Sequence, residues 1–348
     1  MDRSGSHPLQ VAIPRARSRR SVRYEHIGLA VNLLPRISQL TIDTRGAYDA
    51  SRVCRMFRGR AADQLREFRF TSPISEEFVL YAPRLQSLSL SHAESWSSLL
   101  SVNITHVRLE FNLNPAALER SLKSCPRLKE IAIDRVRRPV GFPGDHRKIS
   151  LLPGVRLVIT GSVRTVASVF ALGSTNHLSI TTTLAGYDVL GTPFLELTLP
   201  RDISCLRNLD GLTVVHLRLT DTKDRHMRRT ITVALKCFTA DRETLHVELE
   251  NIQYPNMPWG LIATEPDPGR ITALTVGMRA LGYLRPLGLG KVVELRVDGF
   301  VEKWTIYDSE LRYFLEQMPA LRRIMTGDDD MFSLALGVTE HSVVVERI

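Results

Sequence analysis

Short apolar segments recur along the chain from residue 33 onward, and most have the spacing L-x-x-L-x-L or a close variant. Residues two apart on a β-strand point to the same face, so each segment predicts a short strand with one buried face. The predicted strand centres are Leu40/Ile42, Phe68/Phe70, Leu88/Leu90, Val107/Leu109, Ile131/Ile133, Leu157/Ile159, Leu178/Ile180, Leu197/Leu199, Leu217/Leu219, Val247/Leu249, Leu274/Val276, Leu295/Val297 and Ile324, with a further edge strand at Ser342–Glu346.

Proline marks the entrance to four of these strands. The four copies of this junction are Leu34-Pro35-Arg36-Ile37, Ala82-Pro83-Arg84-Leu85, Cys125-Pro126-Arg127-Leu128 and Met318-Pro319-Ala320-Leu321. Proline lacks an N–H and disfavours helical geometry in the residue before it, so it ends a preceding helix. Helices are predicted between some of the strands, at Asp49–Gly59, Pro115–Ser124 and Asp308–Met318, where apolar residues recur at helical spacing.

The spacing between successive strand centres identifies the architecture. The steps run from 19 to 30 residues and average about 24, which lies within the range of about 20–29 residues typical of leucine-rich repeats. Stacked repeats bury their apolar faces against one another. We therefore predict an α/β fold over residues 24–348, an irregular leucine-rich-repeat solenoid. Its curved parallel sheet would line the concave side, with helices and loops on the convex side.

The composition is that of an ordinary soluble globular protein, with 43% hydrophobic and 24% charged residues. The net charge is +9, and residues 1–23 carry six Arg and one acid, or +5 of it. We predict that residues 1–23 are a disordered basic tail, which is either a nuclear-import or anion-binding arm or a solvated end. The remaining 40 basic and 36 acidic residues form a mixed surface, which argues against a nucleic-acid partner.

Two features bear on the compartment. No apolar stretch suits a secretory signal or a membrane span, so we expect no membrane association. The four cysteines, Cys54, Cys125, Cys205 and Cys237, lie far apart without a C-x-x-C pair. We expect them to be reduced, buried thiols in a cytoplasmic or nuclear protein.

The segments LPRISQL, APRLQSL, CPRLKEI and MPALRRI resemble the helix-to-strand junctions in the leucine-rich-repeat region of fungal F-box proteins. The resemblance extends from about Leu33 to the end of the chain. It implies that the repeats hold a protein substrate for a ubiquitin ligase. It also implies that Skp1 and cullin would join only through an F-box, which is not evident in residues 1–32. The alternative is a free-standing protein- or nucleic-acid-binding solenoid unrelated to ubiquitin.

The best candidate site is a strip of polar residues along the predicted sheet. On each strand, the residue before the first core position and the residue between the two core positions should face away from the core. We interpret this strip as a surface that recognises a protein or peptide, although ordinary solvated strand residues would show the same pattern. The candidate residues are Glu67, Arg69, His106, Arg108, Glu196, His216, Arg218, His246, Glu248, Glu294 and Arg296.

No motif for catalysis, cofactor binding or phosphate binding is present, since the chain lacks G-x-S-x-G, P-loop, H-E-x-x-H and G-x-G-x-x-G. We therefore predict a non-catalytic scaffold without cofactor or metal, the alternative being an enzyme with an unrecognised site. His106, His216 and His246 share one repeat position, but only the last two should be neighbours, whereas zinc needs three or four ligands. The acidic run Gly327–Asp330 is predicted to be a solvated turn, with a divalent-cation loop as the alternative.

Overall fold

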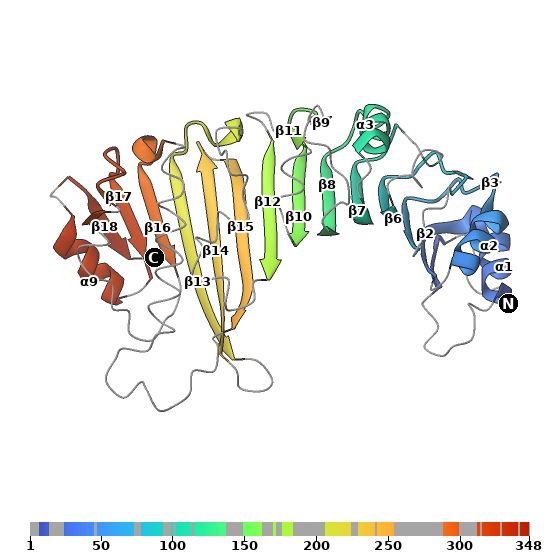
Figure 1. Ribbon diagram of the computed structural model, residues 1–348, viewed down its shortest axis with the longest axis horizontal. Helices are drawn as coiled ribbons and strands as arrows, with labels where there is room; N and C mark the ends of the chain where they lie inside the picture. The colour runs from blue at the N-terminus through green and yellow to red at the C-terminus, as the bar shows by residue number, and fades with distance from the viewer. Residues whose placement is uncertain are drawn as a thin grey trace. The chain divides into compact units, whose positions relative to one another are not determined.

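The computed structural model describes residues 7–13, 24–44, 47–72, 78–92, 99, 102–112, 115–136, 149–161, 170–171, 176–183, 206–223, 229–240, 242–253, 288–298, 312–313, 315–327, 329–339 and 342–347. Within these ranges the fold is α/β, with a mostly parallel sheet of 14 strands and few helices (Figure 1). The chain divides into two compact units, residues 1–158 and residues 159–348. The division falls within strand β10 (Arg156–Gly161).

Unit 1 is built on parallel strands that follow one another in chain order. They are β1 (Leu9–Ile13), β2 (Ile37–Asp43), β4 (Glu67–Thr71), β6 (Ser87–His92), β7 (His106–Asn112) and β8 (Glu130–Val136). The short strands β3 (Arg60–Ala61) and β5 (Leu80–Tyr81) form a second small sheet, and β9 spans Ile149–Ser150.

The register of these strands aligns the predicted core residues in two columns. Leu40, Phe68, Leu88, Val107 and Ile131 pair in sequence across β2, β4, β6, β7 and β8. All five are at most 2% exposed. The second column pairs in the same way and is also buried; it consists of Ile42, Phe70, Leu90, Leu109 and Ile133.

Among its described residues, unit 1 has three α-helices, which cover its core: α1 (Tyr24–Leu33), α2 (Ala47–Phe57) and α3 (Pro115–Lys123). In α2 the buried residues follow the spacing i, i+3, i+4, i+7, which places them on one face; they are Ala50, Val53, Cys54 and Phe57. The chain leaves α2 through Gly59, whose φ of 70° is accessible to glycine without strain. The predictions at Asp49–Gly59 and Pro115–Ser124 are thus confirmed as helices.

Four aromatic rings fix α2 to the sheet. Phe57 comes from α2, Phe68 and Phe70 come from β4, and Phe78 lies between them with none of its surface exposed. The Phe78 ring centroid lies 4.7 Å from that of Phe68, 5.1 Å from that of Phe70 and 5.5 Å from that of Phe57. The tilted geometries add to the energy of burying apolar area.

The proline junctions share one turn. In each of the four copies, the N–H of the last residue donates to the carbonyl of the apolar residue before Pro, as in Leu85 to Ala82 at 3.1 Å and Leu128 to Cys125 at 3.2 Å. The same bond closes three further junctions without the predicted Pro-x-Leu/Ile signature: Leu65 to Ala62, Val155 to Leu152 and Val292 to Leu289. A further copy, Leu209 to Leu206, ends five residues before β13 begins. A single local structure therefore starts strands in both units.

In unit 2, the strands do not follow chain order. They are β11 (Phe170–Ala171), β12 (His177–Thr183), β13 (Val214–Lys223), β14 (Arg229–Thr239), β15 (Arg242–Gln253), β16 (Glu294–Asp298), β17 (Arg323–Thr326) and β18 (Val344–Arg347). The spatial order runs β12-β15-β14-β13-β16-β17-β18 (Figure 1). Strand β14 is antiparallel to both β13 and β15. The short 3-10 helices η4 (Arg207–Leu209) and η6 (Leu289–Lys291) precede β13 and β16, and α9 (Asp329–Val338) precedes β18.

Most predicted strands are confirmed, and two predictions are wrong in part. Strand β14 was not predicted, so the sheet is not wholly parallel. Leu9–Ile13 form β1 and pair with β2, so this part of the predicted disordered tail is a strand; the remainder of residues 1–23 outside 7–13 is not described. The centres at Leu197/Leu199 and Leu274/Val276 lie outside the described residues, as do residues 308–311 and 314 of the predicted helix at 308–318; residues 312, 313 and 315 of it are helical.

Candidate functional site

In unit 1, the polar strip forms two rows that cross the strands in register. The first row pairs Glu67, Ser87, His106 and Glu130 across β4, β6, β7 and β8. The second row lies two residues further along each strand and pairs Arg69, Ser89, Arg108 and Ala132. Neighbouring strands lie about 4.8 Å apart, so these side chains form one continuous surface.

The predicted residues of this surface are accessible. Glu67, Arg69, His106 and Arg108 are all exposed, whereas the core residues that alternate with them are buried. The imidazole Nδ1 of His106 lies 2.8 Å from the Thr105 hydroxyl. The structure thus places four of the predicted residues on one surface, two on β4 and two on β7, with β6 between these strands.

Two ion pairs tie β7, β8 and β10 together on this surface. The Arg108 guanidinium is paired with the carboxylate of Asp134, whose side chain is 10% exposed. The Arg156 guanidinium lies 3.7 Å from the Glu130 carboxylate. Asp134 was not predicted as a site residue, although it continues the alternation of Glu130 and Ala132 by one more step. The strip therefore includes three residues of β8, namely Glu130, Ala132 and Asp134.

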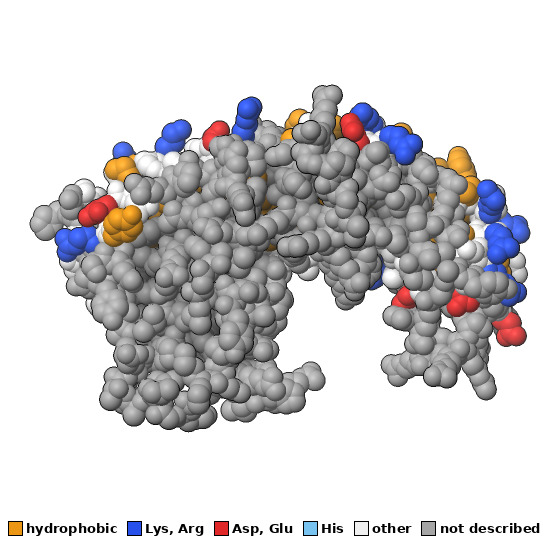
Figure 2. Space-filling model, in the orientation of Figure 1, with side chains coloured by type: hydrophobic (Ala, Val, Ile, Leu, Met, Phe, Trp, Pro, Cys, Tyr) orange, Lys and Arg blue, Asp and Glu red, His pale blue; other side chains and the backbone are white. Residues whose placement is uncertain are grey.

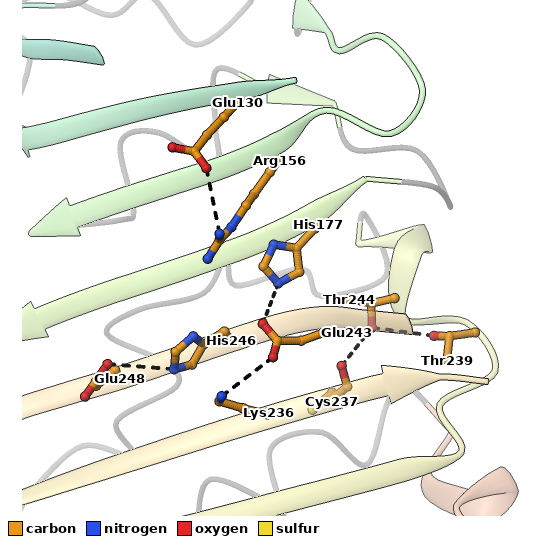
Figure 3. A network of polar contacts seen from close by, with 10 residues as sticks. All are labelled: Glu130, Arg156, His177, Lys236, Cys237, Thr239, Glu243, Thr244, His246 and Glu248. Carbon is orange, nitrogen blue, oxygen red and sulfur yellow. Dashed lines mark hydrogen bonds and ion pairs between the residues drawn. The ribbon is translucent and has the colours of Figure 1, made fainter. Parts of the chain in front are cut away.

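In unit 2, the strip contains a partly buried acid–base cluster (Figure 3). The Nε2 atom of His177 on β12 lies 2.9 Å from Oε1 of Glu243, and Nζ of Lys236 on β14 lies 3.7 Å from Oε2 of the same carboxylate. The His177 side chain is 10% exposed, Glu243 is 28% exposed and Lys236 is 37% exposed. Figure 3 shows both basic groups pointing toward Glu243 from the strands on either side of β15.

A bulge at the start of β15 brings Glu243 onto this face. Phe238 pairs with Glu243 and Cys237 pairs with Leu245, so Thr244 is the extra residue on β15. The Thr244 hydroxyl is buried and donates to the carbonyl of Cys237 at 3.1 Å. Without the bulge, alternation would place Glu243 on the same side as buried Leu245; a bulge shifts that alternation and re-aims side chains.

The two histidines that were expected on adjacent strands are separated by β14. Lys236 pairs with both His216 on β13 and His246 on β15. The prediction that His216 and His246 are direct neighbours is therefore wrong, because the β13–β14 hairpin inserts a strand between them. His246 Nε2 instead lies 3.7 Å from the Glu248 carboxylate on its own strand.

His216 contacts a carboxylate on the next strand. Its Nε2 atom lies 3.1 Å from Oδ2 of Asp298 on β16. Burial lowers the pKa of His216 below 6.5, and the Asp298 carboxylate opposes this shift without cancelling it. His216 is therefore a neutral hydrogen-bonding group at neutral pH.

The charges near the end of unit 2 are paired with one another. Glu294 on β16 accepts from Arg296 at 2.5 Å and from Arg323 on β17 at 3.4 Å. Arg323 also lies 3.7 Å from the carboxylate of Glu346 on β18. Arg218 on β13 is exposed, and Glu196 lies outside the described residues.

The described part of the chain shows no cluster of metal ligands, and two of its buried thiols, Cys125 and Cys237, are protonated. No group of three or more metal-ligating side chains occurs there. Asp329 begins α9 and pairs with Arg347 at 3.0 Å, so this residue of the acidic run is helical and not in a turn. Burial raises the pKa of the Cys125 thiol to about 11 and that of Cys237 to about 12, which keeps both protonated.

Comparisons with known proteins leave the function to be judged from geometry. A scan against protein-family models finds no match. A search of the curated proteins also finds no match. Among the described helices, none combines the length and apolar content needed to cross a membrane.

Proposed function

We propose that the chain is a non-catalytic protein-interaction scaffold whose polar strip binds a protein or an extended peptide. We also propose that its fold is an irregular leucine-rich-repeat solenoid with the strip on the concave side. The recurrent turn at seven of the described strand entrances and the aligned core columns of unit 1 support this fold. Both features are expected where similar units stack and share one core.

The observation that carries the functional proposal is the pair of in-register rows in unit 1. Each strand contributes one side chain to each row, and the rows present acids, bases and hydroxyl groups on one open surface. A protein surface offers many dispersed polar groups, and a mixed row can satisfy them in one register. An active site would instead need convergent groups around a reacting atom.

The resemblance to the repeats of fungal F-box proteins suggests what such a scaffold serves. In this proposal the strip holds a substrate of a ubiquitin ligase in the cytoplasm or nucleus, and Skp1 and cullin join through an F-box. Affinity capture of the full chain from cell extract, followed by mass spectrometry, tests this role. Recovery of Skp1 and cullin would support it, and their absence from a capture that retains other partners would contradict the ubiquitin connection.

Site-specific photocrosslinking tests the strip itself. A crosslinking residue at position 89 lies between Arg69 and Arg108 in the second row, so it should capture the partner. A matched position is Lys123, which is exposed on α3. Crosslinking from 89 but not from 123 is expected; equal crosslinking from both would contradict the strip as the binding surface.

Charge reversal provides the second test. The change R218E/R296E alters two predicted strip residues, and R55E/K123E alters two exposed bases on α2 and α3 as a control. We expect only the strip variant to lose the captured partner. Circular dichroism and thermal unfolding show whether each variant is folded, and an unchanged capture by a folded strip variant would refute the proposal.

A further inference from the structure

A second surface of unit 1 lies at the edge where its strands begin. Each strand entrance has a buried apolar residue, namely Ile37, Leu65, Leu85, Ile104, Leu128 or Val155. The residues immediately before and after each of these form what we call the basic rim. Its twelve members are Arg36, Ser38, Gln64, Arg66, Arg84, Gln86, Asn103, Thr105, Arg127, Lys129, Gly154 and Arg156.

The basic rim has a strongly one-sided charge. Six of its twelve residues are Arg or Lys and none is acidic; the nearest acids, Asp63, Glu67 and Glu130, lie one position outside the rim. Equivalent positions around Leu212, Val292 and Leu321 in unit 2 carry two bases and no acid among six residues. Figure 2 shows Lys and Arg side chains along the upper edge of unit 1, where the strands of Figure 1 begin. Bases also occur along this edge in unit 2, but they make up half of the rim positions in unit 1 and a third of the equivalent positions in unit 2.

Backbone hydrogen bonds place the members of the rim side by side. Gln86 N–H donates to the Arg66 carbonyl, and Thr105 N–H donates to the Gln86 carbonyl. Lys129 and Arg156 continue the series, each at 2.8 Å or less from the preceding carbonyl. The residues that follow the buried apolar position thus form one row, with neighbours one strand apart.

Amide side chains hold two of the guanidinium groups. Arg84 Nη1 donates to Oε1 of Gln64 at 3.0 Å, and Arg127 Nη1 donates to Oδ1 of Asn103 at 3.1 Å. Asn103 is itself fixed, since its Nδ2 donates to the Pro83 carbonyl at 2.8 Å. Amides orient a guanidinium without neutralising it, and each Arg keeps further N–H donors for a ligand.

The positive charge is only partly compensated. Arg156 pairs with Glu130. Arg66, Arg84, Arg127 and Lys129 are exposed, and within the described ranges no carboxylate pairs with any of them. We infer that the basic rim binds an acidic polypeptide segment in extended conformation.

The spacing and composition of the rim favour a peptide over nucleic acid. Arg84 and Arg127 belong to strands two apart, so their attachment points are separated by roughly 10 Å. Three residues of an extended chain span about the same distance, so acids at every third position would meet successive guanidinium groups. The twelve rim positions include no aromatic residue, and binding of single-stranded nucleic acid relies on aromatic stacking.

The rim and the polar strip occupy different positions on each strand and meet at one ion pair, between Arg156 of the rim and Glu130 of the strip. Rim residues lie one position before and after the buried entrance residue, whereas strip residues lie further along the strand, as Ser87 and Ser89 do on β6. A ligand of the rim would therefore leave the strip open. Failure of one proposal is distinguishable from failure of the other, since R84Q/R127Q changes only the rim and R218E/R296E changes only the strip.

Fluorescence anisotropy with a labelled 12-residue peptide, Glu at every third position and Gly or Ser between, tests the inference on the full chain. We expect R84Q/R127Q to weaken binding about tenfold, because two charge-assisted contacts are lost. R66Q/K129Q should weaken it similarly. The control R55Q/K123Q removes the same charge from helices α2 and α3 and should change affinity less than about twofold.

Three results would overturn the inference. The first is equal weakening by the rim and control variants when circular dichroism shows both folded. The second is equal affinity for a peptide of the same composition with contiguous Glu residues, since this contradicts the spacing. The third is tighter binding of a 12-nucleotide oligo-dT through the same residues, which would assign the rim to nucleic acid.

Discussion

The ion pair between Arg108 and Asp134 makes a direct prediction about the strip, because one partner is buried and the other is exposed. The Asp134 side chain is 10% exposed and the Arg108 side chain is 55% exposed. Changing Arg108 to Gln would leave a largely buried carboxylate without its cation. We therefore expect R108Q to lower the free energy of unfolding, although Arg108 lies on an open surface.

The magnitude follows from the two exposures. Opposite charges about 4 Å apart attract by about 1 kcal/mol in water and about 4 kcal/mol at an effective dielectric constant of about 20. Exposure of Arg108 moves the pair toward the first value, and burial of Asp134 moves it toward the second. After desolvation is subtracted, we expect R108Q to cost about 1–2 kcal/mol and a coupling energy with D134N of about 1 kcal/mol.

Urea unfolding followed by circular dichroism measures this in a double-mutant cycle of R108Q and D134N. The matched control is R66Q, an exposed Arg that pairs with no carboxylate in the described part of the chain, and it should cost less than about 0.5 kcal/mol. Equal costs for R108Q and R66Q, or a coupling near zero, would refute the reasoning. The charge swap R108E/D134R keeps the pair, so it separates loss of binding from loss of folding.

Three further predictions concern the core, the pH dependence and the bulge. F78A should lower the free energy of unfolding by about 3–5 kcal/mol, and F78L should lower it by less, because Phe78 is fully buried against three rings. A denaturation midpoint that F78A leaves unchanged would contradict this packing. Since burial lowers the pKa of His216, its contribution to stability is fully present above about pH 6.5 and is lost as the pH falls toward its folded pKa. H216Q should therefore reduce the fall in Tm between about pH 7.5 and 5.5. Curves of Tm against pH that run parallel for H216Q and the unchanged chain would contradict this role of His216. T244V should lower the free energy of unfolding by about 1–3 kcal/mol, because it leaves the buried Cys237 carbonyl without the hydroxyl donor. T244S keeps the hydroxyl and should retain most of the stability. Equal Tm values for T244V and T244S would show that the hydroxyl is not needed.

The periodic part of the fold could be predicted because each strand carries its own signal. Leu88 and Leu90 are two residues apart, Leu85 precedes them by three, and Pro83 precedes Leu85 by two; the structure turns each of these into burial or a turn. The Leu152-Pro153-Gly154-Val155 junction was missed because Val replaces Leu, yet Gly154, at a φ of 80°, closes the same turn. The physical requirement is an apolar residue at that position, and Val meets it.

Strand β14 could not be found by the same rule, since it does not start with the recurrent turn. Val233, Leu235 and Cys237 alternate and are buried, and the step of 30 residues between Leu217 and Val247 leaves room for another strand. The alternation of these three residues, together with the long step, was the signal in the sequence that could have predicted β14. What neither feature encodes is the bulge at Thr244, because a shift of one residue depends on how β14 and β15 pair.

The same bulge explains why the acid–base cluster escaped prediction while the rows of unit 1 did not. In unit 1, the position of a side chain in the strip follows from counting along one strand, as for Glu67 and Arg69. In unit 2, Glu243 reaches the strip only through the pairing of β14 with β15; its partner Lys236 lies on β14 and its partner His177 on β12. Local periodicity therefore predicts which residues line a regular row, but a site built across a reordered part of a sheet depends on contacts distant in sequence. For this reason R218E/R296E tests the strip in unit 2, where the spatial order of the strands differs from their order in the chain. Crosslinking from position 89 tests the strip in unit 1, where the two orders agree.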